Sequence, residues 1–178
     1  MTREYLFAGF GGQGLLFSGK VVAYKALIEN KNVSWIPSYG PEMRGGTANC
    51  SVIVSDEPIG APLISNPDVL VAMNLPSLDK YEDAVKPGGI ILVDSTLIER
   101  KVNRTDVTVF YIPASKLASD NGAPTLANMI LAGKLLETVG EYDEENVQKA
   151  LAKCISARHQ DLLDLNHKVM QIGRSYTE

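Results

Sequence analysis

An apolar run that ends in glycines, "YLFAGFGGQG" at residues 5–14, is the feature that most constrains the fold. An uninterrupted apolar run of this length is typical of a strand buried on both faces, and the glycines permit a tight turn. The residues from Gly14 to Glu29 then follow a helical pattern in which Ser18, Lys25 and Glu29 share one face. We therefore expect a strand, a glycine turn and a helix.

Further apolar runs predict more strands. They cover residues 32–37, 47–55, 68–73, 89–94 and 107–113. The run at 47–55 alternates apolar with mostly polar residues, which predicts a strand with one more polar face. From residue 123 onward, apolar stripes at helical spacing predict three helices, with Asp143 as a cap of the second.

The pattern as a whole predicts an α/β fold, formed as one domain over residues 1–178. We expect a Rossmann-like, mainly parallel sheet flanked by helices, with a helical C-terminal third. The helix expected at residues 125–139 is apolar nearly all round. It should therefore be buried on two sides, either in the core or against a partner subunit.

Charge and hydropathy exclude several classes of protein. The net charge of -4 and the absence of a Lys/Arg block argue against a nucleic-acid partner, which normally requires a basic surface. No basic region followed by an apolar segment marks an export signal at the N-terminus. The most apolar later stretch is interrupted by polar residues and is too short to span a bilayer. We expect a cytoplasmic protein without a membrane or nucleic-acid partner.

The cysteines and histidines do not form a metal-binding pattern. Cys50 and Cys154 lie far apart in the sequence, and His159 and His167 both lie near its end. Zinc and iron-sulfur sites need clustered thiolates or imidazoles. We expect buried cysteines, surface histidines and no metal bound by this chain.

The glycine motif matches two phosphate-binding patterns incompletely. From Gly14 it resembles a P-loop, but Val21 follows Lys20 where a P-loop has the Ser or Thr that binds magnesium. From Gly9 it matches the dinucleotide fingerprint, but the second predicted strand ends in "WIPSYGP", without an acid for the ribose. Binding of NAD or NADP remains an alternative.

The physical property behind both patterns is a set of backbone N–H groups at the positive end of a helix. Gly11, Gly12, Gln13 and Gly14 would supply such an anion cradle. The alternative is that the glycines only permit a tight turn and close packing of helix on sheet. The residues alone leave both interpretations open.

A second unusual segment, "YGPEMRGG", covers residues 39–46. It places Tyr39, Glu42 and Arg44 between Gly40-Pro41 and the pair Gly45 and Gly46, as in a loop that presents side chains. The guanidinium of Arg44 is suited to a phosphate or a carboxylate. The alternative is a rigid surface turn with an incidental Glu/Arg pair.

Three segments in this order, "GFGGQG", "PSYGPEMRGGTANCSVIVSDEPIG" and "PDVLVAMNLPSLDKY", resemble the gamma subunit of 2-oxoacid:ferredoxin oxidoreductases. The resemblance covers nearly the whole chain and is closest to the 2-oxoglutarate enzymes. Branched-chain 2-oxoacid enzymes and the equivalent domain of pyruvate:ferredoxin oxidoreductase are also similar.

The resemblance implies a subunit of an enzyme complex. Such complexes decarboxylate a 2-oxoacid on thiamine diphosphate with magnesium, reduce ferredoxin through iron-sulfur clusters and release acyl-CoA. The partners would be alpha and beta subunits, with a ferredoxin-like delta subunit as a further candidate and ferredoxin as the electron acceptor. We expect the isolated chain to bind none of these cofactors alone and to be inactive, with a homodimer as one form that it could take.

Within such a complex, we expect the glycine turn and the 39–46 loop to lie together at the carboxyl ends of the first two strands. There they would help to bind CoA. Asn121 and Asn128, in "SDNGAPTLAN", are weaker candidates for the rim of the same site, because a turn followed by a helix N-terminus is the favoured explanation for them. A stand-alone protein that binds CoA or a nucleotide is the second alternative.

Overall fold

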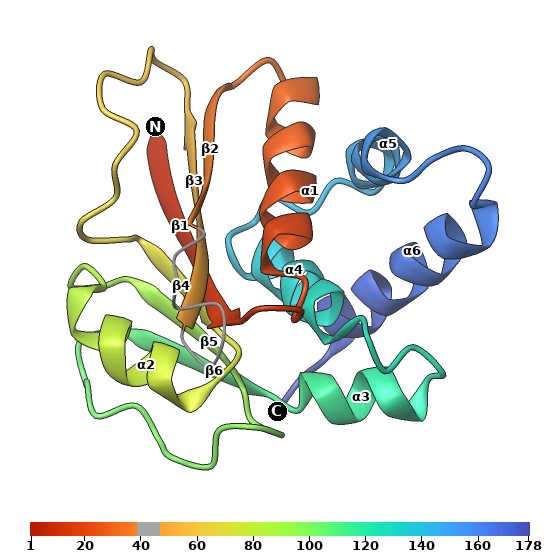
Figure 1. Ribbon diagram of the computed structural model, residues 1–178. Coiled ribbons are helices and arrows are strands. Elements are labelled where there is room, and N and C mark those ends of the chain that lie inside the picture. The colour runs from red at the N-terminus through yellow and green to blue at the C-terminus, as the bar shows by residue number, and fades with distance from the viewer. Residues whose placement is uncertain (39–46) are drawn as a thin grey trace.

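The computed structural model describes residues 1–38 and 47–178 and contains a six-stranded mixed sheet (Figure 1). In spatial order the strands are β2 (Asn32–Ser38), β3 (Thr47–Ser55), β1 (Thr2–Phe10), β4 (Val69–Ala72), β5 (Ile90–Asp94) and β6 (Thr108–Ile112). The strands β1, β4, β5 and β6 are parallel to one another, whereas β3 is antiparallel to both β1 and β2. The predicted α/β class is confirmed.

The antiparallel strand β3 is the feature of the sheet that a mainly parallel pattern does not predict. Only residues 39–46 separate β2 from β3. A parallel connection needs a dozen or more residues, whereas an antiparallel one needs only a few. The chain therefore returns directly, and β3 lies between β2 and β1.

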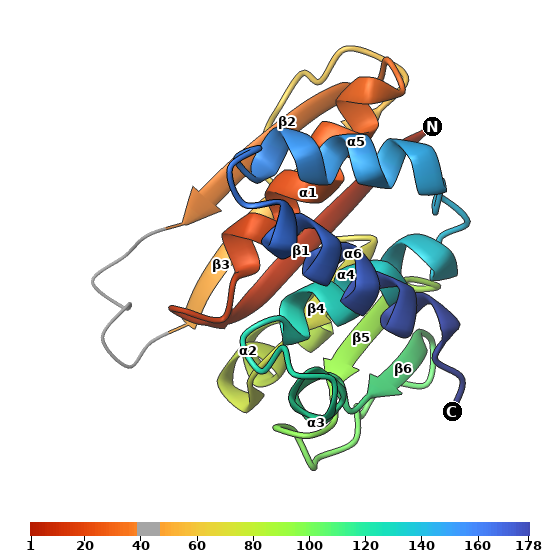
Figure 2. The ribbon, with the colours of Figure 1, turned by 90° about the vertical axis from the view of Figure 1, so that its right-hand side faces the viewer.

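Helices cover both faces of the sheet. They are α1 (Leu15–Ile28), α2 (Leu75–Tyr81), α3 (Ala114–Asp120), α4 (Ala127–Thr138), α5 (Glu144–Cys154) and α6 (Gln160–Ser175), with a short 3-10 turn at Glu82–Ala84. Figures 1 and 2 show α2 on one face, and α1, α4, α5 and α6 on the other. Two apolar cores, one on each face, correspond to these layers.

The short helix α3 was not predicted from the sequence, because it has too few residues to show a helical period of apolar side chains.

The strand β3 has the predicted difference between its faces. Its apolar residues Ala48, Cys50, Val52 and Val54 belong to the core under α1. Asn49 and Ser51, on the other face, are only partly buried. Burial raises the pKa of the Cys50 thiol to about 12, as expected for a cysteine in an apolar core.

Two polar residues of α1 are packed inside the molecule. Ser18 and Lys25 are buried, at 1% and 2% exposed. The Lys25 ammonium lies 2.8 Å from the Glu29 carboxylate, which also accepts a hydrogen bond from Asn146 of α5 at 3.1 Å. A buried charge needs such partners, so this face of α1 contacts other helices instead of solvent.

Capping residues define the starts of two helices, and the predicted cap Asp143 is confirmed. The Asp143 side chain accepts a hydrogen bond from the Asn146 amide at 2.8 Å and caps α5. Asn74 caps α2 in the same way through the Ser77 amide at 2.8 Å, and Pro76 lies in the first turn. Both helix starts are therefore fixed by local interactions.

The helix α4 is buried between the sheet and α6, which confirms the predicted burial on two sides. Glycines permit a close crossing of α4 and α6. A Cβ atom on Gly133 would overlap the carbonyl oxygen of Met170, and one on Gly173 would overlap that of Ile130. The two backbones are thus in direct contact.

We predict that Gly133→Ala or Gly173→Ala lowers the free energy of unfolding by about 1–3 kcal/mol, because a methyl group must separate two packed backbones. Urea denaturation of each variant measures this loss. Gly60→Ala is the control, since a Cβ there meets no atom within 4 Å. Equal stability of Gly133→Ala and Gly60→Ala would contradict the close crossing.

Candidate functional site

The candidate site lies at the edge of the sheet where the parallel strands end. After β1 the chain continues into α1 on one face, whereas after β4 it continues into α2 on the other. The strands β1 and β4 are parallel neighbours, with Ala8 opposite Ala72. Divergence of the chain between two adjacent parallel strands opens a crevice, which is where α/β sheets usually bind ligands.

The glycine turn forms one wall of this crevice. Gly12 and Gly14 have positive φ angles of 89° and 75°, a region that favours glycine. Gly14 is the N-cap of α1 and, within the described residues, no side chain caps this helix. The first N–H groups of α1 are thus available at its positive end, as the anion-cradle interpretation requires.

Gln13 holds the turn against the sheet. Its Oε1 atom accepts a hydrogen bond from the Phe10 amide at 2.6 Å, and its Nε2 atom donates to the Met73 carbonyl at 3.0 Å. The side chain therefore joins the ends of β1 and β4. Its observed contacts are with the backbone, so Gln13 supports the site.

Asn128 holds the other end of the turn. Its Nδ2 atom donates to the Gly14 carbonyl at 3.0 Å, from the first turn of α4. The Ser18 hydroxyl lies 3.3 Å from both the Gly14 and the Asn128 carbonyl oxygens. The structure thus brings Asn128 to the glycine turn, although the two are far apart in the sequence.

Two hollows flank the glycine turn. The first has a volume of about 310 Å³ and is mostly apolar; Phe10, Gly11, Gly12, Gly14, Leu15, Leu16, Phe17 and Ala48 line it. The second has a volume of about 260 Å³ and a more polar lining; Gly12, Gln13, Met73, Ser115, Pro124, Thr125 and Ala127 line it. Gly12 contributes to both, so the turn separates an apolar from a polar space.

Asp94 and Ser115 are site residues that the sequence reasoning missed. Asp94 ends β5, is 0% exposed and accepts a hydrogen bond from the Ser115 hydroxyl at 2.5 Å. Its other oxygen accepts from the amides of Thr96 and Ser115 at 3.1 and 3.3 Å. Ser115, which lines the polar hollow, is therefore held in place by a buried carboxylate. The sequence contained one signal for this part of the site, because an acid directly follows the apolar run at residues 90–93.

The structure describes only some of the remaining predicted site residues. Tyr39, Glu42, Arg44, Gly45 and Gly46 lie outside the described residues. The neighbouring strand ends are described: Thr47 pairs with Phe10, at the end of β1, and Ser38 pairs with Asn49. The 39–46 segment is therefore attached at the edge that carries the glycine turn.

Asn121 lies at the other end of α3 from Ser115. Its side chain donates to the Leu117 carbonyl at 2.8 Å and so completes the last turn of that helix. It is absent from the residues that line the two hollows. A role of Asn121 in ligand binding stays a prediction.

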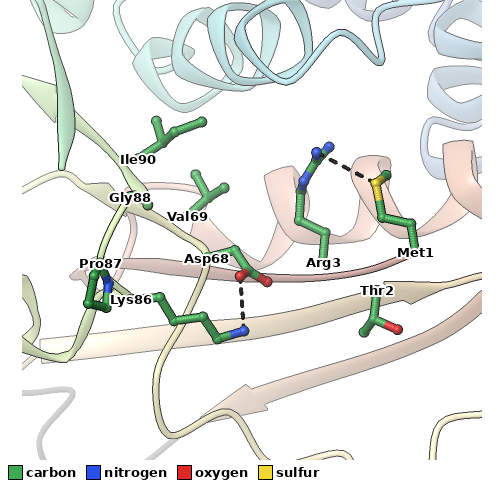
Figure 3. A pocket seen from close by; sticks show the side chains of 10 residues that line it. Met1, Thr2, Arg3, Asp68, Val69, Lys86, Pro87, Gly88 and Ile90 are labelled. Carbon is green, nitrogen blue, oxygen red and sulfur yellow. Dashed lines mark hydrogen bonds and ion pairs between the residues drawn. The ribbon is translucent and has the colours of Figure 1, made fainter. Parts of the chain in front are cut away.

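A further hollow, of about 340 Å³, lies at the opposite edge of the sheet (Figure 3). Its charged residues already have partners: Lys86 contacts Asp68 at 2.9 Å and Glu4 at 2.8 Å, and Arg3 pairs with Glu141. Figure 3 shows Lys86 directed toward Asp68 and the Arg3 side chain directed away from both. Because these charges compensate one another, the carboxyl edge remains the better candidate.

Residues 1–38 and 47–178 contain neither a metal-binding cluster nor a membrane-spanning helix. No group of three or more His, Cys, Asp or Glu side chains that could hold a metal ion occurs there. Within the same ranges, no helix is both long and apolar enough to cross a membrane.

Comparison with known proteins identifies the family. Residues 4–176 match the model of the pyruvate ferredoxin/flavodoxin oxidoreductase family. The chain therefore belongs to this family. A solved structure, the gamma subunit of a keto/oxoacid ferredoxin oxidoreductase from Geobacter sulfurreducens, is similar with a TM-score of 0.82 and 30% identity, over 97% of this chain and 96% of that one. The resemblance to a gamma subunit is confirmed.

Two curated relatives differ in length and in substrate. The 2-oxoglutarate synthase subunit KorC of Methanocaldococcus jannaschii is 38% identical over 85% of this chain and 82% of the relative. The ketoisovalerate oxidoreductase subunit VorA of Methanothermobacter thermautotrophicus is 39% identical over 95% of this chain. The chain spans only 35% of the length of that VorA protein.

We predict that Gln13→Glu destabilises the chain by about 1–3 kcal/mol at pH 7, because a carboxylate cannot donate to the Met73 carbonyl. A protonated carboxyl can donate, so the pKa of Glu at this position is raised in the folded state above its unfolded value of about 4.3. The stability is therefore retained below that unfolded pKa and is lost as the pH rises.

Chemical denaturation of Gln13→Glu between pH 4 and pH 8 measures this dependence. The control is Gln160→Glu, an exposed position at the start of α6, which should change stability by less than about 0.5 kcal/mol. A Gln13→Glu variant whose loss of stability did not vary with pH would contradict the proposed contact between strands.

Proposed function

We propose that this chain is the non-redox, gamma-type subunit of a multi-subunit 2-oxoacid:ferredoxin oxidoreductase. The complex would convert a 2-oxoacid, CoA and oxidised ferredoxin into acyl-CoA, CO2 and reduced ferredoxin. The match of the family over residues 4–176 and the similarity to a solved gamma subunit along nearly its whole length support this proposal.

For the substrate we propose 2-oxoglutarate. The 2-oxoglutarate synthase subunit KorC corresponds to this chain over 82% of its own length, whereas VorA does so over only 35%. A subunit that matches nearly end to end is the better model for a separate gamma chain. The 39% identity to VorA makes a branched-chain 2-oxoacid the second candidate.

The role that the geometry supports best is binding of the anionic groups of CoA. The observation that carries it is the exposed glycine turn between the two hollows, at a start of α1 that no side chain of residues 1–38 or 47–178 caps. Backbone N–H groups at a positive helix end bind phosphate groups well, and the apolar hollow next to them suits a less polar part of the same ligand. Arg44 remains a proposed contact to an anion on the basis of its sequence context.

The partners would supply the remaining chemistry. Thiamine diphosphate stabilises the carbanion formed on decarboxylation, and iron-sulfur clusters carry single electrons. The described residues of this chain offer no metal-binding cluster for either group. We propose that alpha and beta subunits, with a delta subunit as a further candidate, hold thiamine diphosphate, magnesium and the clusters in the cytoplasm, and that ferredoxin is the electron acceptor.

A stand-alone NAD(P)-binding protein is the alternative. In dinucleotide-binding folds, the acid that binds the ribose follows a parallel strand next to the first. In this chain the strand next to β1, on the side away from β4, is the antiparallel β3. The amino end of β3 therefore occupies the edge of the sheet where this acid would lie. This arrangement favours the proposed subunit over the alternative.

Purification of the chain from its native host tests the proposal. The expected result is co-purification with chains that contain thiamine diphosphate and iron-sulfur clusters, and CoA-dependent reduction of ferredoxin with a 2-oxoacid. A panel of 2-oxoglutarate, 2-oxoisovalerate and pyruvate identifies the substrate. A chain that purifies alone and binds NADH or NADPH at submicromolar concentration would overturn the proposal.

We predict that Gly12→Ala in the complex raises the KM for CoA about fivefold or more, which corresponds to a loss of about 1 kcal/mol in binding. The added methyl group enters the wall shared by the two hollows. Steady-state kinetics with CoA as the varied substrate measure the effect.

The matched control for Gly12→Ala is Gly88→Ala. Gly88 also has a positive φ, 77°, and open space around its Cβ position, but it lines the hollow at the opposite edge. Both variants should therefore lose a similar stability of about 1–2 kcal/mol from backbone strain. Equal changes of the KM for CoA in the two variants would contradict a site at the glycine turn.

A further inference from the structure

We propose that residues 176–178 form a strap that covers the outer edge of β6, and that displacement of this strap lets β6 pair with β6 of a second copy of the chain. The surface lies at the side of the sheet, away from the glycine turn. The inference therefore does not depend on the proposed enzymatic role.

The strand β6 is the last strand of the sheet, and within the described residues only β5 pairs with it. The Thr108 amide donates to the Gly89 carbonyl at 2.9 Å, so Thr108 directs its backbone groups toward β5. Because this direction alternates along a strand, Val109 and Tyr111 direct their N–H and C=O groups outward. Such a row of outward groups is a template for pairing with another strand.

The strap lies on this edge. Figures 1 and 2 show the residues after α6 running toward β6. At its base, Tyr176 packs against the core, and its carbonyl accepts a hydrogen bond from the Lys134 ammonium of α4 at 2.8 Å. At its tip, the Oε1 atom of Glu178 accepts a hydrogen bond from the Tyr111 amide at 2.6 Å. The strap therefore occupies one of the outward donors of β6.

The strap is held by few contacts. A hollow of about 260 Å³ separates it from the strand, and Val109, Phe110 and Ile112 of β6 line this hollow together with all three strap residues. Thr177 and Glu178 are exposed. Because polar contacts around an open space hold the strap, it can leave the edge without unfolding of the sheet.

The two edge strands of the sheet are protected in different ways. At the other side, β2 contains Pro37, and the missing N–H of a proline protects an edge against pairing. The sequence of β6, TVFYI, contains neither a proline nor a charged side chain. Natural sheets also protect an edge by covering it with another part of the chain. The strap supplies that cover for β6.

A second copy of β6 fits the edge that the strap covers. In an antiparallel pair about a two-fold axis at Phe110, Val109 lies opposite Tyr111 of the second copy, and the two exchange hydrogen bonds through their outward groups. The two Phe110 residues form an aromatic cross-strand pair, and no like charges meet. This pairing needs the Tyr111 amide, which Glu178 occupies, so the strap and the second copy exclude each other.

Hydrogen exchange of backbone amides in the full chain, measured by NMR, tests the strap. In Glu178→Ala the Tyr111 amide loses its acceptor and should exchange about fivefold faster or more. Glu178→Gln keeps an acceptor oxygen and should change the rate less than about twofold. The control for loss of charge is Glu145→Ala, because Glu145 is an exposed acid on α5, and it should leave the Tyr111 rate unchanged.

Sedimentation equilibrium tests the second copy. A chain without residues 176–178 should self-associate with a Kd at least about tenfold lower than that of the full chain. In this shortened chain, Val109→Pro removes an outward N–H and leaves the bonds to β5 in place, since edge strands tolerate proline. It should return the Kd to the value of the full chain. If the shortened chain does not fold, Glu178→Ala replaces it in this measurement.

Three results would overturn the inference. They are an unchanged exchange rate of the Tyr111 amide in Glu178→Ala, equal Kd values for the shortened and the full chain, and self-association of the shortened chain that Val109→Pro does not weaken. These measurements need neither partner subunits nor CoA. Their failure is therefore separate from failure of the proposed enzymatic role, which is tested by co-purification and ferredoxin reduction.

Discussion

The burial of the middle of β1, from Tyr5 to Gly9, is the constraint on which the rest of the structure depends. The strand lies between β3 and β4, and its residues Tyr5 to Ala8 contribute to the apolar cores on both faces. The chain leaves this strand and enters α1 through a tight turn, in which Gly12 and Gly14 adopt positive φ angles. The same turn exposes backbone N–H groups at the start of α1. The glycine turn that permits the fold therefore also forms the candidate site.

Side chains from distant segments hold this turn. Gln13 fixes it to the end of β4, and Asn128 fixes it to the start of α4. The helix α4 is in turn fixed by its close crossing with α6 at Gly133 and Gly173. The helical C-terminal third thus does more than cover one face of the sheet, because it determines the position of a wall of the site.

Much of the fold followed from local patterns. Apolar runs of strand length, the alternation in β3, the cap at Asp143 and the helical stripes after residue 123 each depend on a few neighbouring residues. The direction of β3 and the short α3 did not follow from them. Strand direction depends on the length of the preceding connection and on pairing with a partner, and a helix of one to two turns has no readable period.

The site could be predicted only in part. The glycine turn was found because its residues are consecutive, and residues 39–46 remain a prediction from sequence. The Asp94 and Ser115 pair was missed, since its members belong to separate elements and meet only through the pairing of β5 with β6. Asn128 was identified, but as a possible ligand contact, whereas the structure gives it a contact with Gly14.

The sequence by itself determined the class of fold, the glycine turn and the family, because these depend on short segments whose order along the chain is enough to recognise them. The tertiary structure alone decided which residues surround the turn. It brought the starts of α1 and α4 into contact and placed an apolar and a polar hollow on either side of Gly12. The physical reason is that burial of two apolar layers fixes the helices on the sheet, and only then do polar groups more than a hundred residues apart, such as Gly14 and Asn128, come within hydrogen-bonding distance.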